Sequence, residues 1–223
     1  EADQNLSSKR MAAEVMPLYI KYLPVFSSIA LDKQAEKIKR KMVNSLSFIG
    51  LNKQTKNQIE NSFKRLIDLL EKHFSVHQYL FGGRPAIADF AFWGQLYNCW
   101  MDITARNFIN QRPNLVKWLK RMEKPKVLGD FVGWSDVYLT LEPIFEKEVA
   151  GLFLPWSDAN DKAQKAKKED FSVFLENKEF NQKTKKNYSK SLKELRFKYN
   201  EYALKESIKP ILINTGCLKY LGG

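Results

Sequence analysis

The sequence contains little cysteine. Cys99 and Cys217 are its two cysteines, and they lie far apart without forming a Cys-x-x-Cys pair. A disulfide-stabilised scaffold and a cysteine-bound structural zinc need more thiols at closer spacing, so the composition argues against both. We expect both cysteines to be small core residues of a protein in the reducing cytoplasm.

Histidine is equally scarce. His73 and His77 are the two histidines, and a spacing of four residues on a helix can bring two imidazoles to one metal ion. No third ligand follows at a recognisable spacing, so we predict no metal site. We expect a pair of polar aromatic side chains at a helix end, where a histidine suits the helix dipole.

Long apolar runs are also missing. No stretch of about 18 apolar residues is present, so no segment is expected to span a membrane. The chain does not open on a basic segment followed by an apolar one, which argues against a secretory signal. Its first residue is Glu1 rather than methionine, so we expect the chain to be a fragment, a processed product or the ordered part of something longer.

The chain is basic, with a net charge of +12 over 223 residues. Residues 162–205 contain thirteen Lys or Arg against six Asp or Glu. Such a segment could bind nucleic acid, with bases stacking on the tyrosines of residues 183–205. No recognised nucleic-acid-binding module accompanies the charge. The favoured interpretation is therefore a lysine-rich solvated surface, and nucleic-acid binding stays the weaker alternative.

Apolar residues recur mostly at helical spacing. In residues 55–74 the apolar positions fall on one helical face: Ile59, Phe63, Leu66, Leu70 and Phe74. Similar patterns predict helices over residues 8–31, 33–47, 87–103, 113–124, 139–154, 157–168 and 183–205. Alternating apolar residues before Asn177 predict a β-hairpin over residues 171–180. Strands and helices do not alternate, so the sequence predicts an all-α fold with one short hairpin.

Some of these helices carry more specific signals. Thr55 and Gln58 have the spacing of a capping box. Residues 87–103 are apolar nearly all round, so this helix is expected to be central and buried. Gly94 in its interior costs about 1 kcal/mol relative to alanine, which close approach of another helix would offset. The tyrosines and leucines of residues 183–205 share one face, which is expected to point inward.

Asp89 stands near the start of the apolar helix. If residue 86 is the N-cap, Asp89 is the third helical residue, and its carboxylate can accept a hydrogen bond from the N-cap backbone. A buried helix start leaves N–H groups that water cannot reach, and the carboxylate also meets the positive end of the helix dipole. No His, Cys or acid adjoins it, so we expect a structural N-cap rather than a catalytic group.

The residues around Asp89 resemble a known family. Residues 79–90 read YLFGGRPAIADF, which closely resembles the Y-L-x-G-x-x-P-[S/T]-x-A-D motif of the glutathione transferase C-terminal domain. Arg112 to Leu115, followed by Trp118, resembles the next helix of that domain. Ala86 departs from the motif, because the family usually has Ser or Thr there, and the lost hydroxyl costs about 1 kcal/mol. The resemblance is specific over roughly residues 55–125.

The resemblance implies an all-α, glutathione transferase C-terminal-like helical domain over residues 1–157. Residues 158–223 are then an extension of helix, hairpin and helix on the same core. In this family a thioredoxin-like first domain binds glutathione and activates its thiol, and nothing in this chain resembles that domain. The resemblance therefore implies that this chain supplies the wall of a hydrophobic electrophile site and a dimer surface. Glutathione, the co-substrate of such a detoxifying transferase, would be bound mainly outside this chain.

The resemblance suggests four residues for that wall. These are Met16 and Tyr19 from the first helix, and Tyr97 and Trp100 from the apolar helix. The spacing of the two aromatics equally fits plain core packing. No catalytic residue is assigned, and the chain alone is expected to be inactive. In the alternative interpretation the domain is a non-catalytic module that binds a protein partner, a role that similar helical domains also have.

Overall fold

The computed structural model describes residues 8–9, 11–13, 24–46, 50–201 and 205–222. The fold is helical with one two-stranded sheet, as the sequence predicts. The longer elements in chain order are α3 (Pro24–Leu46), α4 (Lys56–Val76), α5 (Ile87–Met101), α6 (Ile103–Ile109), α7 (Pro113–Glu123), α8 (Trp134–Ile144), the π-helix η2 (Phe145–Phe153), α9 (Leu154–Lys165), β1 (Asp170–Leu175), β2 (Lys178–Lys183), α10 (Lys186–Glu201), α11 (Lys205–Asn214) and α12 (Leu218–Leu221).

The main core lies among α4, α5, α7 and α8. Helix α4 packs against α7 and α8, and α5 packs against α6 and α7. Trp118 is fully buried at the centre, where its ring stacks on Phe74 with 4.6 Å between centroids. Pro113 begins α7 as expected, and the side chain of Glu71 accepts hydrogen bonds from the backbone N–H groups of Asn114 and Leu115.

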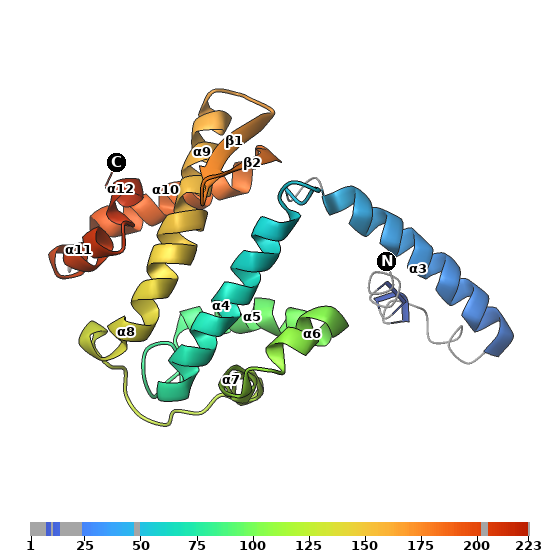
Figure 1. Ribbon diagram of the computed structural model, residues 1–223, viewed down its shortest axis with the longest axis horizontal. Coiled ribbons are helices and arrows are strands. Elements are labelled where there is room, and N and C mark those ends of the chain that lie inside the picture. The colour runs from blue at the N-terminus through green and yellow to red at the C-terminus, as the bar shows by residue number, and fades with distance from the viewer. Residues whose placement is uncertain (1–7, 10, 14–23, 47–49, 202–204, 223) are drawn as a thin grey trace.

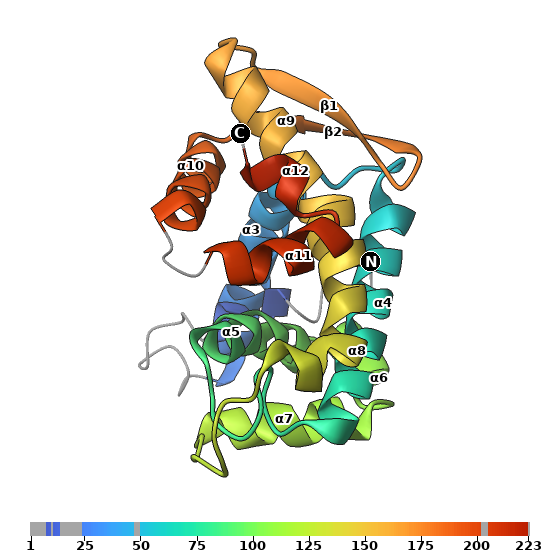
Figure 2. The same cartoon turned by 90° about the vertical axis from the view of Figure 1, so that its left-hand side faces the viewer.

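Helix α8, η2 and α9 form one continuous rod that runs beside α4 (Figures 1 and 2). Pro143 lies near the end of α8, immediately before the π-helical turns. A proline removes one backbone donor from the helical ladder, and π-helical turns accommodate such a disruption without ending the helix. The sequence predicts two separate helices here, and the structure joins them.

The predicted hairpin is confirmed, with β1 and β2 antiparallel and Val173 opposite Phe180. Glu176 and Asn177 form the turn with φ values of 51° and 63°. Two successive residues with positive φ are the signature of the type I′ turns that suit the twist of a tight hairpin. The hairpin packs against α9, so the extension and the helical rod share contacts.

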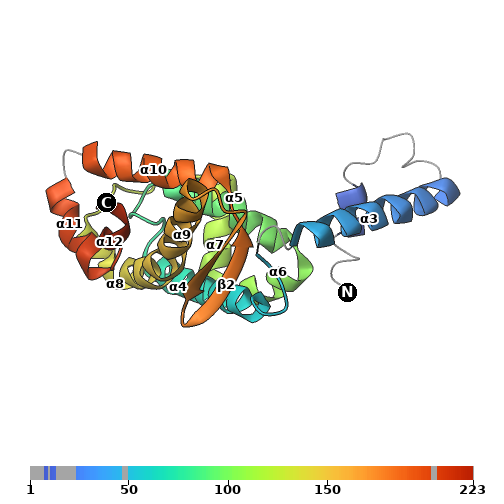
Figure 3. The same ribbon diagram turned by 90° about the horizontal axis from the view of Figure 1, so that it is seen from above.

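A second, smaller core joins the C-terminal helices to the rod. It contains Ala150, Leu154, Leu192, Cys217 and Leu221, and Figure 3 shows α10, α11 and α12 around the η2–α9 region. The expected inward face of α10 is only partly right. Leu192 is buried, whereas Tyr188 and Leu195 are exposed, because α10 is covered on one narrow side.

The capping box predicted for Thr55 and Gln58 does not form. Thr55 begins α4 without a side-chain cap, because its hydroxyl oxygen accepts from the backbone N–H of Asn52 at 3.0 Å while its O–H donates to the carbonyl of Gly50 at 2.6 Å. Gln58 instead reaches the hairpin, where its Nε2 donates to the carbonyl of Leu175 at 2.7 Å. A long-range contact has replaced the local capping box.

Helix α3 extends away from α4 and the helices that follow it in Figures 1 and 3. Within the described part of the chain, no helix is both long and apolar enough to cross a membrane.

Candidate functional site

Asp89 is fully buried and accepts three hydrogen bonds. Its Oδ2 accepts from the backbone N–H of Ala86 at 2.9 Å, and its Oδ1 accepts from the backbone N–H of Leu80 and the indole N–H of Trp118, both at 3.0 Å. Burial raises the pKa of Asp89, and these three hydrogen bonds oppose the shift. The carboxylate thus joins the start of α5, the preceding turn and α7.

Helix α5 is not buried all round, which corrects the sequence prediction. Asp89 and Leu96 are its buried residues, whereas Ile87 is 90% exposed, Phe90 48% and Met101 37%. Gly94 also lacks the expected neighbour, because a Cβ added there would meet no described atom within 4 Å. An apolar face of α5 is therefore open, and we call Ile87, Phe90, Gly94 and Met101 the α5 face.

Three aromatic residues of α5 flank this face. Trp93, Tyr97 and Trp100 form a ladder with ring centroids 5.2 Å and then 6.2 Å apart. All three are half-buried. Trp100 donates its indole N–H to Asn110 at 2.9 Å, and Trp93 donates to the carbonyl of Leu119 at 3.2 Å. Two of the four predicted wall residues, Tyr97 and Trp100, thus lie together on α5.

Met16 and Tyr19, the other two predicted wall residues, lie outside the described residues.

The two histidines lie at the end of α4, as expected, with ring centroids 4.9 Å apart. His73 is fully buried, and its two ring nitrogens lie 2.8 Å from the hydroxyl of Thr140 and 3.2 Å from the carbonyl of Tyr79. Burial lowers the pKa of His73 to about 4, so the ring is neutral at pH 7. The described residues contain no group of three or more metal-ligating side chains.

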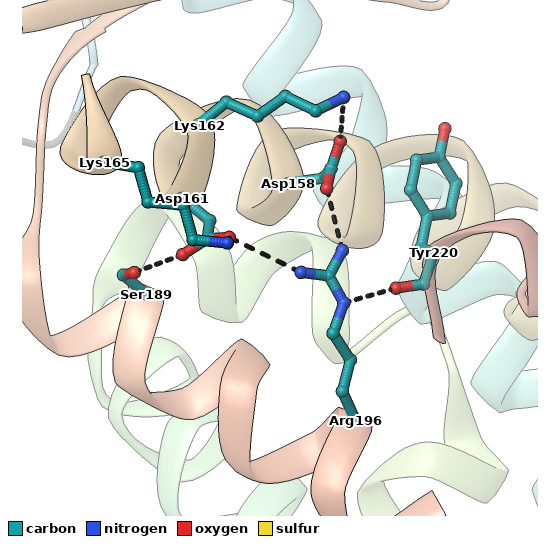
Figure 4. Close-up of polar contacts among 7 residues, drawn as sticks. All are labelled: Asp158, Asp161, Lys162, Lys165, Ser189, Arg196 and Tyr220. Carbon is teal, nitrogen blue, oxygen red and sulfur yellow. Dashed lines mark hydrogen bonds and ion pairs between the residues drawn. The ribbon is translucent and has the colours of Figure 1, made fainter. Parts of the chain in front are cut away.

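An ion-pair network attaches the C-terminal helices to α9 (Figure 4). The guanidinium of Arg196 on α10 lies 2.8 Å from Asp158 and 3.4 Å from Asp161, and its Nε donates to the carbonyl of Tyr220 at 2.8 Å. Burial alone would raise the pKa values of both aspartates, but hydrogen bonds and nearby positive charges outweigh it and lower them. The spacing of basic residues along α10 could not reveal this network, because the ion pairs form only when the fold brings α10 against α9.

The sequence also did not reveal a cavity of about 850 Å³ between the start of α4, the rod, the hairpin and the start of α10. Trp156 is one of the residues that line it. Residues from six elements meet there, and no single periodic pattern could have identified them. Neither Tyr97 nor Trp100 lines this cavity.

Comparison with known families gives one match. Residues 53–121 match the family described as the glutathione S-transferase C-terminal domain. That range contains α4, α5, α6 and most of α7, including Asp89 and all three of its hydrogen-bond donors. No curated protein and no solved structure matches the chain significantly.

Proposed function

We propose, from the premise that residues 53–121 form a glutathione S-transferase C-terminal-like domain, that this chain is the helical half of a glutathione transferase-like protein. Its role would be to hold an apolar electrophile, while a thioredoxin-like domain outside this chain binds glutathione and activates the thiol. The surface that forms between the two halves would be the electrophile site. A homodimer in the cytoplasm, with a role in detoxification, is part of the same proposal.

The observation that carries the proposal is the open α5 face. An exposed apolar helix surface costs free energy in water and is typical of a surface that a ligand or another domain covers. Tyr97 and Trp100 lie on the same helix, where half-buried aromatic rings can stack on an apolar molecule.

The direct test is conjugation of glutathione to an aryl halide by the protein made from the full open reading frame. We expect Tyr97→Ala and Trp100→Ala to raise the KM for the aryl halide and to leave the KM for glutathione unchanged. Tyr138→Ala is the control, because Tyr138 is an exposed tyrosine on α8. If the full-length protein conjugates no electrophile, or if all three variants behave alike, the proposal fails.

One observation favours the alternative of a non-catalytic protein-interaction domain. Residues 127–132 expose several large apolar side chains: Val127, Leu128, Phe131 and Val132. Backbone hydrogen bonds from Gly83 to Asp130 and from Leu128 to Gly83 hold this segment in place, at 2.9 and 2.8 Å. An ordered apolar patch of this kind suits a protein partner. This function would be favoured if the full-length protein lacks conjugation activity and Phe131→Ser abolishes binding of a purified partner.

A further inference from the structure

The large cavity lies apart from the α5 face. Its walls come from α4, η2, α9, the hairpin and the first turn of α10, which lie together at the upper end of the rod in Figure 1. Apolar side chains dominate these walls, among them Ile59, Leu152, Trp156 and Phe180. A volume of about 850 Å³ is typical of cavities that take a whole small molecule.

The aromatic walls are held in place by specific contacts. The indole N–H of Trp156 donates to the side-chain oxygen of Gln182 at 2.9 Å, and its ring meets Tyr188 edge-on with centroids 4.8 Å apart. Phe180 lies against Gly50, where φ is +81° and an added Cβ would come within 2.5 Å of the phenyl ring. Because these rings cannot collapse inward freely, the cavity is a built feature of the fold.

Gln58, a buried polar residue, is among the residues that line the cavity. Gln58 is 6% exposed, and its Nε2 donates a hydrogen bond to the carbonyl of Leu175. Its Oε1 has no hydrogen-bond partner among the described residues. Buried acceptors are normally paired, but this oxygen has almost no accessible surface, so the side chain forms part of the wall without offering an acceptor to a ligand.

The charge around the cavity is positive at one end. The acidic residue of the lining, Glu148, is already bound by Arg65 at 2.5 Å and by the hydroxyl of Ser62 at 2.9 Å. Lys185 and Lys186 lie where α10 begins. Burial, together with the charge of nearby Lys183, lowers the pKa of Lys185.

The start of α10 adds to this positive end. The first turn of α10 contains no acidic residue, and the first N–H groups of a helix have no acceptor within it. The buried amide of Asn160 fixes this point of the chain, because it accepts from the backbone N–H of Lys185 at 2.7 Å and donates to the carbonyl of the same residue at 2.9 Å.

We propose that this cavity binds an aromatic acid, a molecule with a flat apolar body and a single carboxylate or sulfonate. The body would lie against Trp156 and Phe180, and the anion would lie beside Lys185 and Lys186. The site involves neither the α5 face nor a thiol, so it does not depend on the proposed transferase function.

The test uses two dyes that share one apolar body. 1-Anilinonaphthalene-8-sulfonate carries an anion and an N–H, whereas N-phenyl-1-naphthylamine carries the N–H alone. We expect both to bind the full chain saturably by fluorescence titration, the sulfonate more tightly. Replacing both lysines, Lys185→Gln with Lys186→Gln, should weaken binding of the sulfonate about five- to tenfold, because two favourable charge interactions are lost. Binding of the neutral dye should not change.

Matched variants locate the site and separate charge from folding. Lys190→Gln with Lys193→Gln removes the same charge further along α10, from residues outside the cavity lining, and should leave both affinities unchanged. Leu152→Trp fills the cavity and should abolish binding of both dyes, whereas Leu212→Trp, in a separate cavity of about 330 Å³, should not. Circular dichroism checks that each variant is folded.

Three results would overturn the proposal. The first is that neither dye binds saturably. The second is that the two lysine pairs weaken the sulfonate equally, which would mean that only general surface charge matters. The third is that Leu212→Trp, rather than Leu152→Trp, removes binding.

Discussion

Replacing Asp89 with alanine should destabilise the protein far more than an ordinary helix cap would. Asp89 is fully buried, and its two oxygens are the acceptors for the backbone N–H groups of Ala86 and Leu80 and the indole N–H of Trp118. Asp89→Ala leaves these three donors without the carboxylate. Leaving a buried donor unsatisfied costs about 1–3 kcal/mol.

The three losses are not independent, because one relaxation or one entering water can serve more than one donor. We therefore expect the free energy of unfolding to fall by about 3–6 kcal/mol. At about 2–4 °C per kcal/mol for a chain of this size, the thermal midpoint should drop by roughly 10–20 °C. Asp89→Asn should cost less, because an amide keeps one acceptor but places an NH2 group against one of the three donors.

The matched control is Asp136→Ala. Asp136 also accepts a hydrogen bond at a helix start, from the backbone N–H of Gly133 at 3.1 Å, but that cap is exposed. Its removal should cost about 0.5–2 kcal/mol. Urea unfolding followed by circular dichroism measures both variants. If Asp89→Ala costs no more than Asp136→Ala, the claim that burial of this cap organises the fold is wrong.

Three further predictions can be checked by the same unfolding assay. The pKa of His73 is lowered to about 4, so the unfolded state binds more protons than the folded state between pH 6.5 and 4. The free energy of unfolding should therefore fall by roughly 3 kcal/mol as the pH drops through that range. His73→Gln should remove this pH dependence, and His77→Gln should not. Arg196→Met breaks the partly buried ion pairs with Asp158 and Asp161 and should lower the free energy of unfolding by about 2–3 kcal/mol. The decrease should be smaller below the pH at which those aspartates become protonated. In the hairpin, φ of Asn177 is 63°, a conformation that valine disfavours and glycine tolerates. Asn177→Val should therefore lower the free energy of unfolding by about 1–2 kcal/mol, whereas Asn177→Gly should leave it nearly unchanged. Equal effects of the two substitutions would refute this account of the turn.

The sequence alone was sufficient for features that depend on neighbouring residues. The hairpin with its turn at Asn177, the start of α7 at Pro113 and the position of Asp89 three residues after the N-cap all follow from local patterns. Each is set by backbone geometry and hydrogen bonding within a few residues, which the order of side chains already contains.

Other features were decided by the tertiary structure. The apolar composition of α5 indicated burial, yet one side of the helix is open, because burial depends on which elements pack against it. Gln58 left its expected capping role for a carbonyl more than a hundred residues away in the chain. The cavity beside Trp156 likewise exists only after six elements converge. Local periodicity determines which helices and strands form, but contacts between distant residues decide which faces stay exposed and where a ligand can enter.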